Sequence, residues 1–322
     1  MNCLNYLKEH QDIPYKIFKN ALENNKLFHC YLLVGEIGTP LLEIATFLAA
    51  SIIDNKSSPF VEEDSNIYKR IQNGSYNDFK LLDAAKGSVK IDEIRSLEDQ
   101  FLRTATEING KKVYIINLIE NLNIDSVNAL LKFLEEPQED TYAFLLTNNE
   151  FKLLPTIRSR AQTVHFSLID RATIINEAIE LGCDEGDAQI LSYFYNDAEL
   201  VTDIAKEKTF IALIGSVIDT LQYVENYYRL MENVLNDLVK KVKDKNSARQ
   251  LFDILIVFFK EALKYKINSK TYLEKYDTIL LELSKKDNLE DSILVLMNSR
   301  NEVNYNMNTN LLIVHTMQKI FG

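Results

Sequence analysis

The chain has 322 residues, enough for two or three domains that each bury a hydrophobic core. Charged residues make up 26% and apolar residues 46%, with only 9 glycines and 5 prolines, so the composition predicts a helix-rich globular protein and argues against disorder. The net charge of −11 argues against a broad nucleic-acid-binding surface, because neutralising phosphates requires clustered lysine and arginine.

The sequence also limits the location and the metal chemistry. No apolar run reaches the roughly 18 residues that a membrane span needs, and the first residues are too polar for a signal peptide. We therefore expect a cytoplasmic protein. Cys3, Cys30 and Cys183 are far apart and form no C-x-x-C pair, and the histidines are scattered. We expect buried, reduced thiols and no metal site.

The first part of the chain predicts a helix, a strand and a second helix. Residues 1–26 have the spacing of an amphipathic helix, 30–34 form a short apolar strand, and 43–53 form an apolar helix. The connection at 35–42 therefore stands where a phosphate-binding loop would lie.

That loop departs from the phosphate-binding pattern GxxxxGK[ST]. Gly35 matches the first glycine and Gly38 lies within the loop, but Pro40, Leu41 and Leu42 replace the second glycine, the lysine and the hydroxyl residue. Proline removes a backbone donor, and leucine supplies neither a charge for phosphate nor an oxygen for magnesium. We expect an ordinary strand-to-helix turn with both leucines in the core; an unusual ATP site is the alternative.

The middle of the chain predicts a helix at 91–102, a strand at 111–120 and a helix at 126–135, capped by Asp125 or Ser126. The strand at 111–120 is apolar without alternation, which is typical of a parallel sheet buried on both faces. We interpret Glu120, just past this strand, as a surface carboxylate.

Two further strands and a basic turn follow. The strands are predicted at 142–147 and 162–166, and the turn lies between them at 155–161. We expect Asn148 and Asn149, at the end of the first of these strands, to satisfy local backbone groups. The whole pattern predicts an α/β fold with a parallel sheet.

Only helical patterns follow residue 168. Three short helices are predicted at 170–181, 185–195 and 196–206, and residues 209–322 have helical spacing throughout. The last segment has no visible chemistry, and its aromatic residues are typical of a core.

Two contiguous motifs carry a family resemblance: NALLKFLEEP at 128–137 and LLPTIRSR at 153–160. On these motifs the chain resembles the clamp-loader branch of the AAA+ ATPases, and within it the delta-prime type of DNA polymerase III subunit. The resemblance implies a P-loop-type AAA+ domain over 1–167, a small helical lid over 168–208 and an all-α collar over 209–322 that assembles subunits into a ring.

The resemblance also assigns a role to the basic turn. Relatives use the arginine of a Ser-Arg-Cys motif to reach the γ-phosphate bound by a neighbouring subunit, and the matching residue here is Arg160, preceded by Ser159 and Arg158. Ala161 replaces the usual cysteine. Arginine suits this role because it keeps its charge and offers a planar fork of donors. The alternative is that Arg158 and Arg160 are solvated or structural charges.

Other family positions point to a lost nucleotide site. Asn117 and Leu118 stand where relatives place the aspartate and glutamate of the Walker B motif, and Glu199 matches a phosphate-contacting arginine. Residues 51–90 hold no cysteine, so the four-cysteine zinc module of many relatives is absent. We expect no cofactor and no metal.

The expected function is that of a non-catalytic stator. Its expected partners are the gamma or tau ATPase subunits and the delta subunit in a hetero-pentameric ring, with sliding clamp and primer-template DNA bound through the complex. Two alternatives remain: a divergent gamma- or tau-like subunit that hydrolyses ATP, and a delta-like module that only contacts the clamp.

Overall fold

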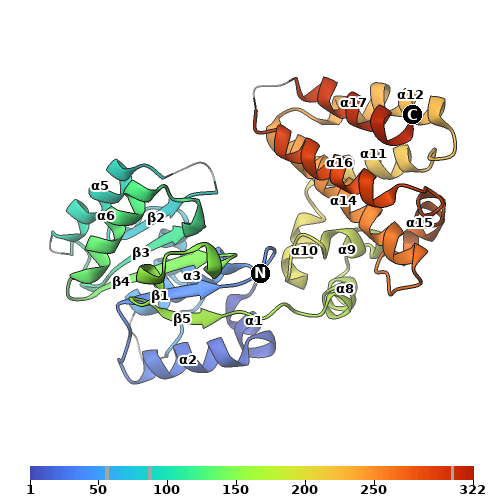
Figure 1. Cartoon of the computed structure of the whole chain (residues 1–322). Helices are drawn as coiled ribbons and strands as arrows, with labels where there is room; N and C mark the ends of the chain where they lie inside the picture. Colours follow the sequence, from blue (N-terminus) through green and yellow to red (C-terminus); the bar gives the residue numbers. More distant parts are fainter. Residues whose placement is uncertain (55–57, 86–88, 104, 306–307) are drawn as a thin grey trace. The chain divides into compact units, whose positions relative to one another are not determined.

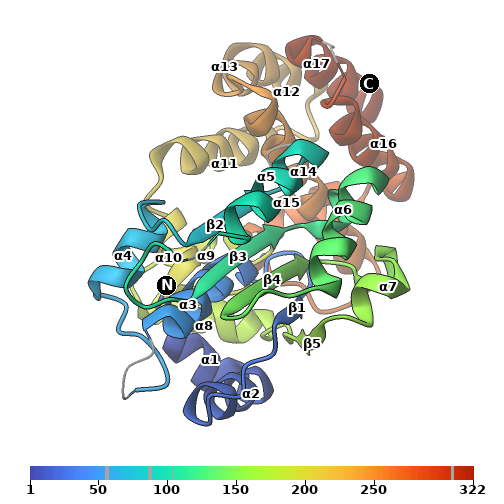
Figure 2. The same ribbon diagram turned by 90° about the vertical axis from the view of Figure 1, so that its left-hand side faces the viewer.

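The computed structural model describes residues 1–322 except 55–57, 86–88, 104 and 306–307. The chain divides into two compact units, residues 1–169 and 170–322. Each unit is described by itself, with the course of the chain shown in Figures 1 and 2.

The first unit is built on a five-stranded, fully parallel sheet with strand order β2-β3-β4-β1-β5. The three central strands, β3, β4 and β1, are buried nearly throughout because both faces are covered, as their uninterrupted apolar runs predict, whereas the edge strands β2 and β5 carry exposed residues. The strands are β1 (Cys30–Val34), β2 (Phe79–Asp83), β3 (Lys112–Asn117), β4 (Thr141–Thr147) and β5 (Gln162–His165).

Helices cover the two faces of this sheet (Figure 2). Alternate residues of the strands join two separate cores: Tyr31 and Leu33 pack with α1 to α4, whereas Cys30 and Leu32 pack with α5 to α7. The helices are α1 (Cys3–His10), α2 (Asp12–Glu23), α3 (Leu41–Asp54), α4 (Asn66–Gln72), α5 (Ile91–Phe101), α6 (Ile124–Glu135) and α7 (Pro155–Arg158).

The structure corrects two local predictions. Residues 1–26 form two helices, because Gln11 leaves helical geometry and its side-chain amide bonds both the N–H and the C=O of Ser167. Helix α6 begins at Ile124, and its cap is Asn123, whose side chain accepts from the N–H of Ser126. The predicted caps Asp125 and Ser126 lie inside the helix.

The described part of the second unit is helical, as predicted. Its helices include α8 (Arg171–Glu180), α9 (Glu185–Leu191), α10 (Ala198–Ile204), α11 (Lys208–Leu221), α12 (Tyr227–Asn233), α13 (Val239–Lys241), α14 (Lys245–Lys266), α15 (Asp277–Ser284), α16 (Leu289–Glu302) and α17 (Thr309–Phe321), and a π-helical segment at 234–238. The predicted division of this unit into lid and collar near residue 208 stays a prediction.

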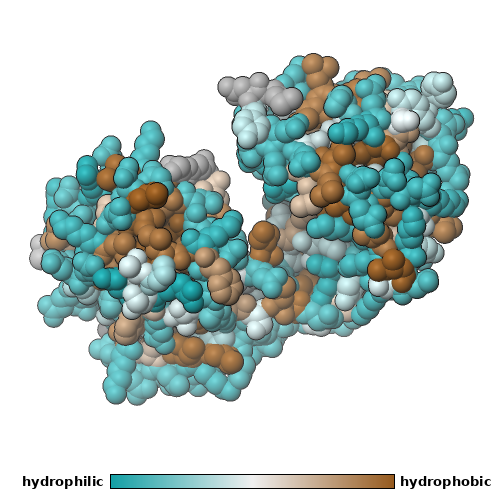
Figure 3. Space-filling model, in the orientation of Figure 1, coloured by the Kyte–Doolittle hydropathy of each residue, from teal (hydrophilic) through white to brown (hydrophobic). Residues whose placement is uncertain are grey.

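The face shown in Figure 3 is mostly hydrophilic, with brown hydrophobic patches on both units. Within the described ranges, no helix combines the length and the apolar character that crossing a membrane requires.

Candidate functional site

The carboxyl ends of β3, β4 and β1 lie side by side, because β4 pairs in parallel with both of the others. Ligands of open parallel sheets bind at this edge, where the strand order reverses. The residues that follow these strands are Gly35 after β1, Leu118 after β3 and Asn148 after β4. They define the edge at which a nucleotide would be held.

The loop between β1 and α3 is closed by its own residues. The side chain of Thr39 packs against Gly35 so closely that a Cβ on Gly35 would lie 3.0 Å from two Thr39 carbons. The N–H of Thr39 donates to the carbonyl of Glu36 at 3.0 Å, and Gly38 turns the chain with φ of +99°. This backbone donor therefore bonds within the loop and does not face an incoming phosphate.

The first turn of α3 is packed into the core. Leu41 is only 5% exposed and Leu42 is half-buried against the same core, and Pro40 is buried. The packing predicted for the two leucines is confirmed. A lysine at position 41 would need to reach out of a site that is filled with apolar atoms.

The end of β3 carries an amide and an apolar residue. The Asn117 side chain donates to Asp83 Oδ1 at 2.8 Å, so it ties β3 to its neighbour β2. Leu118 is half-buried and adopts a left-handed conformation with φ of +53°. Neither side chain supplies a carboxylate for magnesium or a base for water.

Glu120 lies at this edge and is not the surface carboxylate we predicted. Its Oε1 accepts the backbone N–H of Asn148 at 2.9 Å, and its buried Oε2 has no hydrogen-bond partner among the residues the structure describes. The Asn148 amide in turn donates to the carbonyl of Gly35 at 2.9 Å. Glu120 therefore helps to join three strand ends, a contact across 28 residues that local spacing could not reveal.

Both asparagines bond backbone groups, as predicted, but only the partner of Asn149 is local in sequence, since the partner of Asn148 lies 113 residues away. Asn148 bonds the Gly35 carbonyl, and the Asn149 side chain accepts the N–H of Phe151 at 3.1 Å. Both therefore satisfy backbone groups of nearby loops.

The basic turn contains the short helix α7, which begins with Pro155, a residue favoured there because its missing N–H has no helical partner to lose. Arg158 lies 3.4 Å from Glu150, a carboxylate that also lies 3.0 Å from His165 at the carboxyl end of β5. Arg158 therefore links loop and strand within its own chain. The Ser159 hydroxyl donates to the Thr156 carbonyl at 3.1 Å.

Arg160 points to a different part of the sheet. Its Nη2 donates to Glu135 Oε1 at 2.6 Å, and its Nη1 donates to the Thr156 carbonyl at 2.9 Å. The side chain is 31% exposed, so its guanidinium lies at the surface and is not folded into the interior.

The main chain of Arg160 contacts a histidine that sequence analysis passed over. The His29 ring hydrogen-bonds the Arg160 backbone; partial burial lowers the pKa of His29, and this bond opposes the shift. Because Tyr31 pairs with Gln162 in the sheet, residues just before β1 come close to residues just before β5. No local signal could have paired His29 with Arg160.

The loop lies at the carboxyl ends of the strands, and Arg160 lies at their amino ends. Gly35 follows β1, whereas His29 precedes β1 and Glu135 precedes β4. A five-residue strand is about 16 Å long. The guanidinium is therefore held roughly a strand length away from the loop of its own chain.

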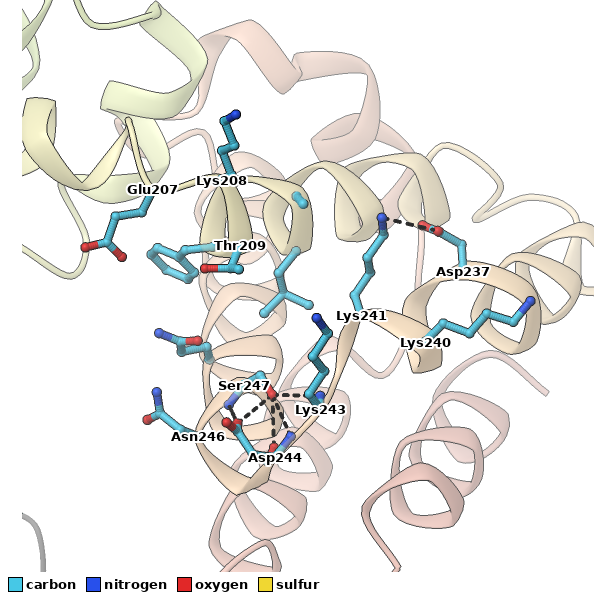
Figure 4. A pocket seen from close by; sticks show the side chains of 14 residues that line it. Glu207, Lys208, Thr209, Asp237, Lys240, Lys241, Lys243, Asp244, Asn246 and Ser247 are labelled. Atoms are coloured by element: carbon cyan, nitrogen blue, oxygen red, sulfur yellow. Dashed lines mark hydrogen bonds and ion pairs between the residues drawn. The ribbon is translucent and has the colours of Figure 1, made fainter.

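The second unit contains a cavity of about 700 Å³ between the start of α11 and the residues around α13 and α14 (Figure 4). Its lining includes Lys208, Lys240, Lys241 and Lys243 (Figure 4). Lys241 lies 3.9 Å from Asp237, and Asp244 caps α14 by accepting the N–H of Ser247. Asp237 and Asp244 are thus engaged locally, and we assign no chemistry to this cavity.

The remaining predicted residues fall as follows. All three cysteines are buried, as expected, and burial raises the pKa of Cys3 to about 12. Across the described ranges, no three His, Cys, Asp or Glu side chains gather as a metal site would require. Glu199 lies in the first turn of α10, which Asp197 caps.

Fold and site together define an AAA+-type α/β unit with an altered phosphate loop, followed by a helical unit. A crystal structure of a DNA polymerase III gamma subunit-related protein from Thermotoga maritima has the same fold. It superposes with a TM-score of 0.59 at 16% sequence identity, over 95% of this chain and 97% of that one.

Sequence comparisons define the family. The family model described as "DNA polymerase III, delta subunit" matches residues 10–170. DNA polymerase III subunit delta' of Bacillus subtilis is 26% identical over 315 residues, which cover 96% of this chain and 95% of that protein. Subunit tau of the same organism is 30% identical over 280 residues, 78% of this chain and 48% of tau. The chain belongs to the DNA polymerase III delta subunit family.

Proposed function

We propose that this chain is a delta-prime-type clamp-loader subunit that does not hydrolyse ATP itself and supplies Arg160 in trans to the ATP site of a neighbouring subunit. It acts as a stator: a nucleotide-free member of the ring that completes an adjacent site while the sliding clamp is loaded on primed DNA.

The observation that carries this proposal is the separation of the two features on one sheet. The carboxyl ends of the strands hold a loop closed by Thr39 and Leu41, and the opposite ends hold a partly exposed guanidinium. A cation placed a strand length from its own loop cannot stabilise a phosphate bound there, so its use requires a triphosphate on another molecule.

The size of the rate effect of an arginine supplied in trans explains why a chain without its own ATP site would keep such a residue. An arginine supplied in trans is worth roughly 10³ to 10⁵ in phosphoryl-transfer rate, about 4 to 7 kcal/mol of barrier. Losing it would silence one neighbouring site.

The proposed partners follow from the relatives. Gamma or tau ATPase subunits and a delta subunit would complete a hetero-pentameric ring, with the helical second unit as the assembly element. The net charge of −11 supports contact with primer-template DNA mainly through the assembled complex.

The direct test is Arg160→Ala in a clamp loader reconstituted with its ATPase partners. Clamp- and DNA-stimulated ATP hydrolysis and clamp loading should both fall steeply while the complex still assembles, as checked by its mass. Unchanged turnover together with unchanged loading would remove the proposed role.

The 30% identity to tau favours one competing function, a divergent subunit that hydrolyses ATP. Binding of a fluorescent ATP analogue to the isolated chain separates the two. We predict no measurable affinity, because Pro40, Leu41 and Asn117 supply no ligand for phosphate or magnesium. Saturable magnesium-dependent binding would favour the ATPase.

A further inference from the structure

Arg160 is held at three points: once by its own turn and twice by segments that are distant in sequence. The His29 ring bonds its backbone, the Thr156 carbonyl accepts from Nη1 at 2.9 Å, and Glu135 Oε1 accepts from Nη2 at 2.6 Å. Glu135 is the last residue of α6, and His29 immediately precedes β1. The position of Arg160 is therefore fixed by contacts with residues that adjoin α6 and β1, and not by its own turn alone.

We propose that Glu135 is a positioning residue for Arg160: its carboxylate selects the side-chain rotamer that presents the guanidinium to the neighbouring subunit's phosphate. This inference rests on the proposed function and goes beyond it, because it assigns a task to a second residue, Glu135, that acts through Arg160.

The geometry leaves donors available for that task. The Arg160 Nη1 donates to the Thr156 carbonyl, and Nη2 donates to Glu135. Among the residues the structure describes, the guanidinium has no other hydrogen-bond acceptor. A guanidinium carries further N–H groups in the same plane. Fixing two bonds in this plane orients the rest, so the group arrives at the phosphate with less conformational entropy left to lose.

Arg158 shows what happens when an arginine of the same turn pairs with a different carboxylate. It sits two residues earlier, but Glu150, itself only 14% exposed, holds it toward the carboxyl end of β5. Glu135 is 52% exposed and at the surface. The same residue type is thus aimed at two places by two carboxylates, one partly buried and one accessible.

Glu136 provides a matched control. It is the adjacent carboxylate, it is exposed, and it ends α6 as its C-cap, while the Arg160 ion pair is made by Glu135. Substituting either residue changes the net charge of this surface equally. A difference between the two variants therefore reports geometry, not the long-range field.

The experiment measures steady-state ATP hydrolysis by the reconstituted clamp loader carrying Glu135→Lys or Glu136→Lys. We expect Glu135→Lys to lower kcat by about 3- to 10-fold with little change in KM for ATP or in assembly of the complex. Glu136→Lys should stay close to wild type. Glu135→Gln, which keeps an oxygen acceptor, should recover part of the loss.

A double-mutant cycle with Arg160→Ala separates positioning from a structural effect. If Glu135 acts through Arg160, adding Glu135→Lys to Arg160→Ala should cause no further loss. An equal loss in both backgrounds, a kcat no lower than that of Glu136→Lys, or a raised kcat would each overturn the inference while leaving the proposed function in place. Turnover that Arg160→Ala does not alter would overturn both.

Discussion

The loop between β1 and α3 and the turn around α7 belong to the same α/β unit but have opposite chemistry. In the loop, Pro40 has no N–H, the N–H groups of Thr39 and Leu41 bond within the loop, and the first turn of α3 is packed into the core. In the turn, two arginines remain, and Arg160 keeps its guanidinium at the surface through Glu135.

This difference between the loop and the turn shows that an α/β unit of this kind can lose its phosphate loop and still keep its arginine. The loop must surround a triphosphate, so replacing its glycine and lysine by proline and leucine lets the space fill with the chain's own side chains. The arginine needs only to be held in position at the amino ends of the strands, and the residues that hold it are not those of the loop. One can therefore degenerate while the other keeps its geometry.

Among the changes that test this comparison, the largest effect on the free energy of unfolding should come from restoring the missing lysine. Leu41→Lys places a cation where a leucine is 5% exposed, so we expect the free energy of unfolding to fall by about 3 kcal/mol with no gain in ATP affinity. Urea denaturation and titration with a fluorescent nucleotide measure the two. Leu42→Lys, at the half-buried neighbour, serves as the control and should cost less. Full stability together with ATP binding would break the comparison.

A smaller effect is expected at the other arginine. Arg158→Ala removes the same charge as Arg160→Ala, but Arg158 is paired with Glu150, which also contacts His165 at the carboxyl end of β5. We expect neighbouring ATP turnover to stay within about 3-fold of wild type, because Arg158 is held by a different carboxylate from the one that positions Arg160. The cost in stability should be about 0.5 to 1 kcal/mol. A loss in turnover as large as that of Arg160→Ala would show that both arginines serve the neighbour.

The smallest effect is expected at Thr39. Its Oγ1 is buried and has no hydrogen-bond partner among the described residues, while its carbons fill the turn beside Gly35. Thr39→Val keeps the shape and removes the unbonded hydroxyl, so stability should stay level or rise by up to about 1 kcal/mol. Thermal unfolding of the two proteins tests this. A drop of more than about 1 kcal/mol would mean that the hydroxyl has a partner, such as a bound water.

Much of the fold was predictable because it depends on local patterns. The apolar runs of β1, β3 and β4 were each located within a few residues, since a strand buried on both faces needs a continuous apolar segment. The edge strand β5, which has exposed residues at both ends, was also located within a residue. Strand β2 was not predicted: it lies at the sheet edge, where two of its five residues are exposed and its pattern is weaker. The break at Gln11 was missed because its cause, a bond to Ser167, lies 156 residues away.

The amino-acid sequence by itself determined that the phosphate loop lacks its lysine and second glycine, that the arginine motif is present, and that a parallel sheet precedes a helical region. Each of these is a property of residue type or of spacing along one element. Tertiary structure alone decided that Glu120 bonds Asn148, that His29 contacts Arg160, and that Glu135 and Glu150 aim two nearby arginines at different places. These contacts join the ends of different strands and helices, so they exist only once the sheet has brought those ends together.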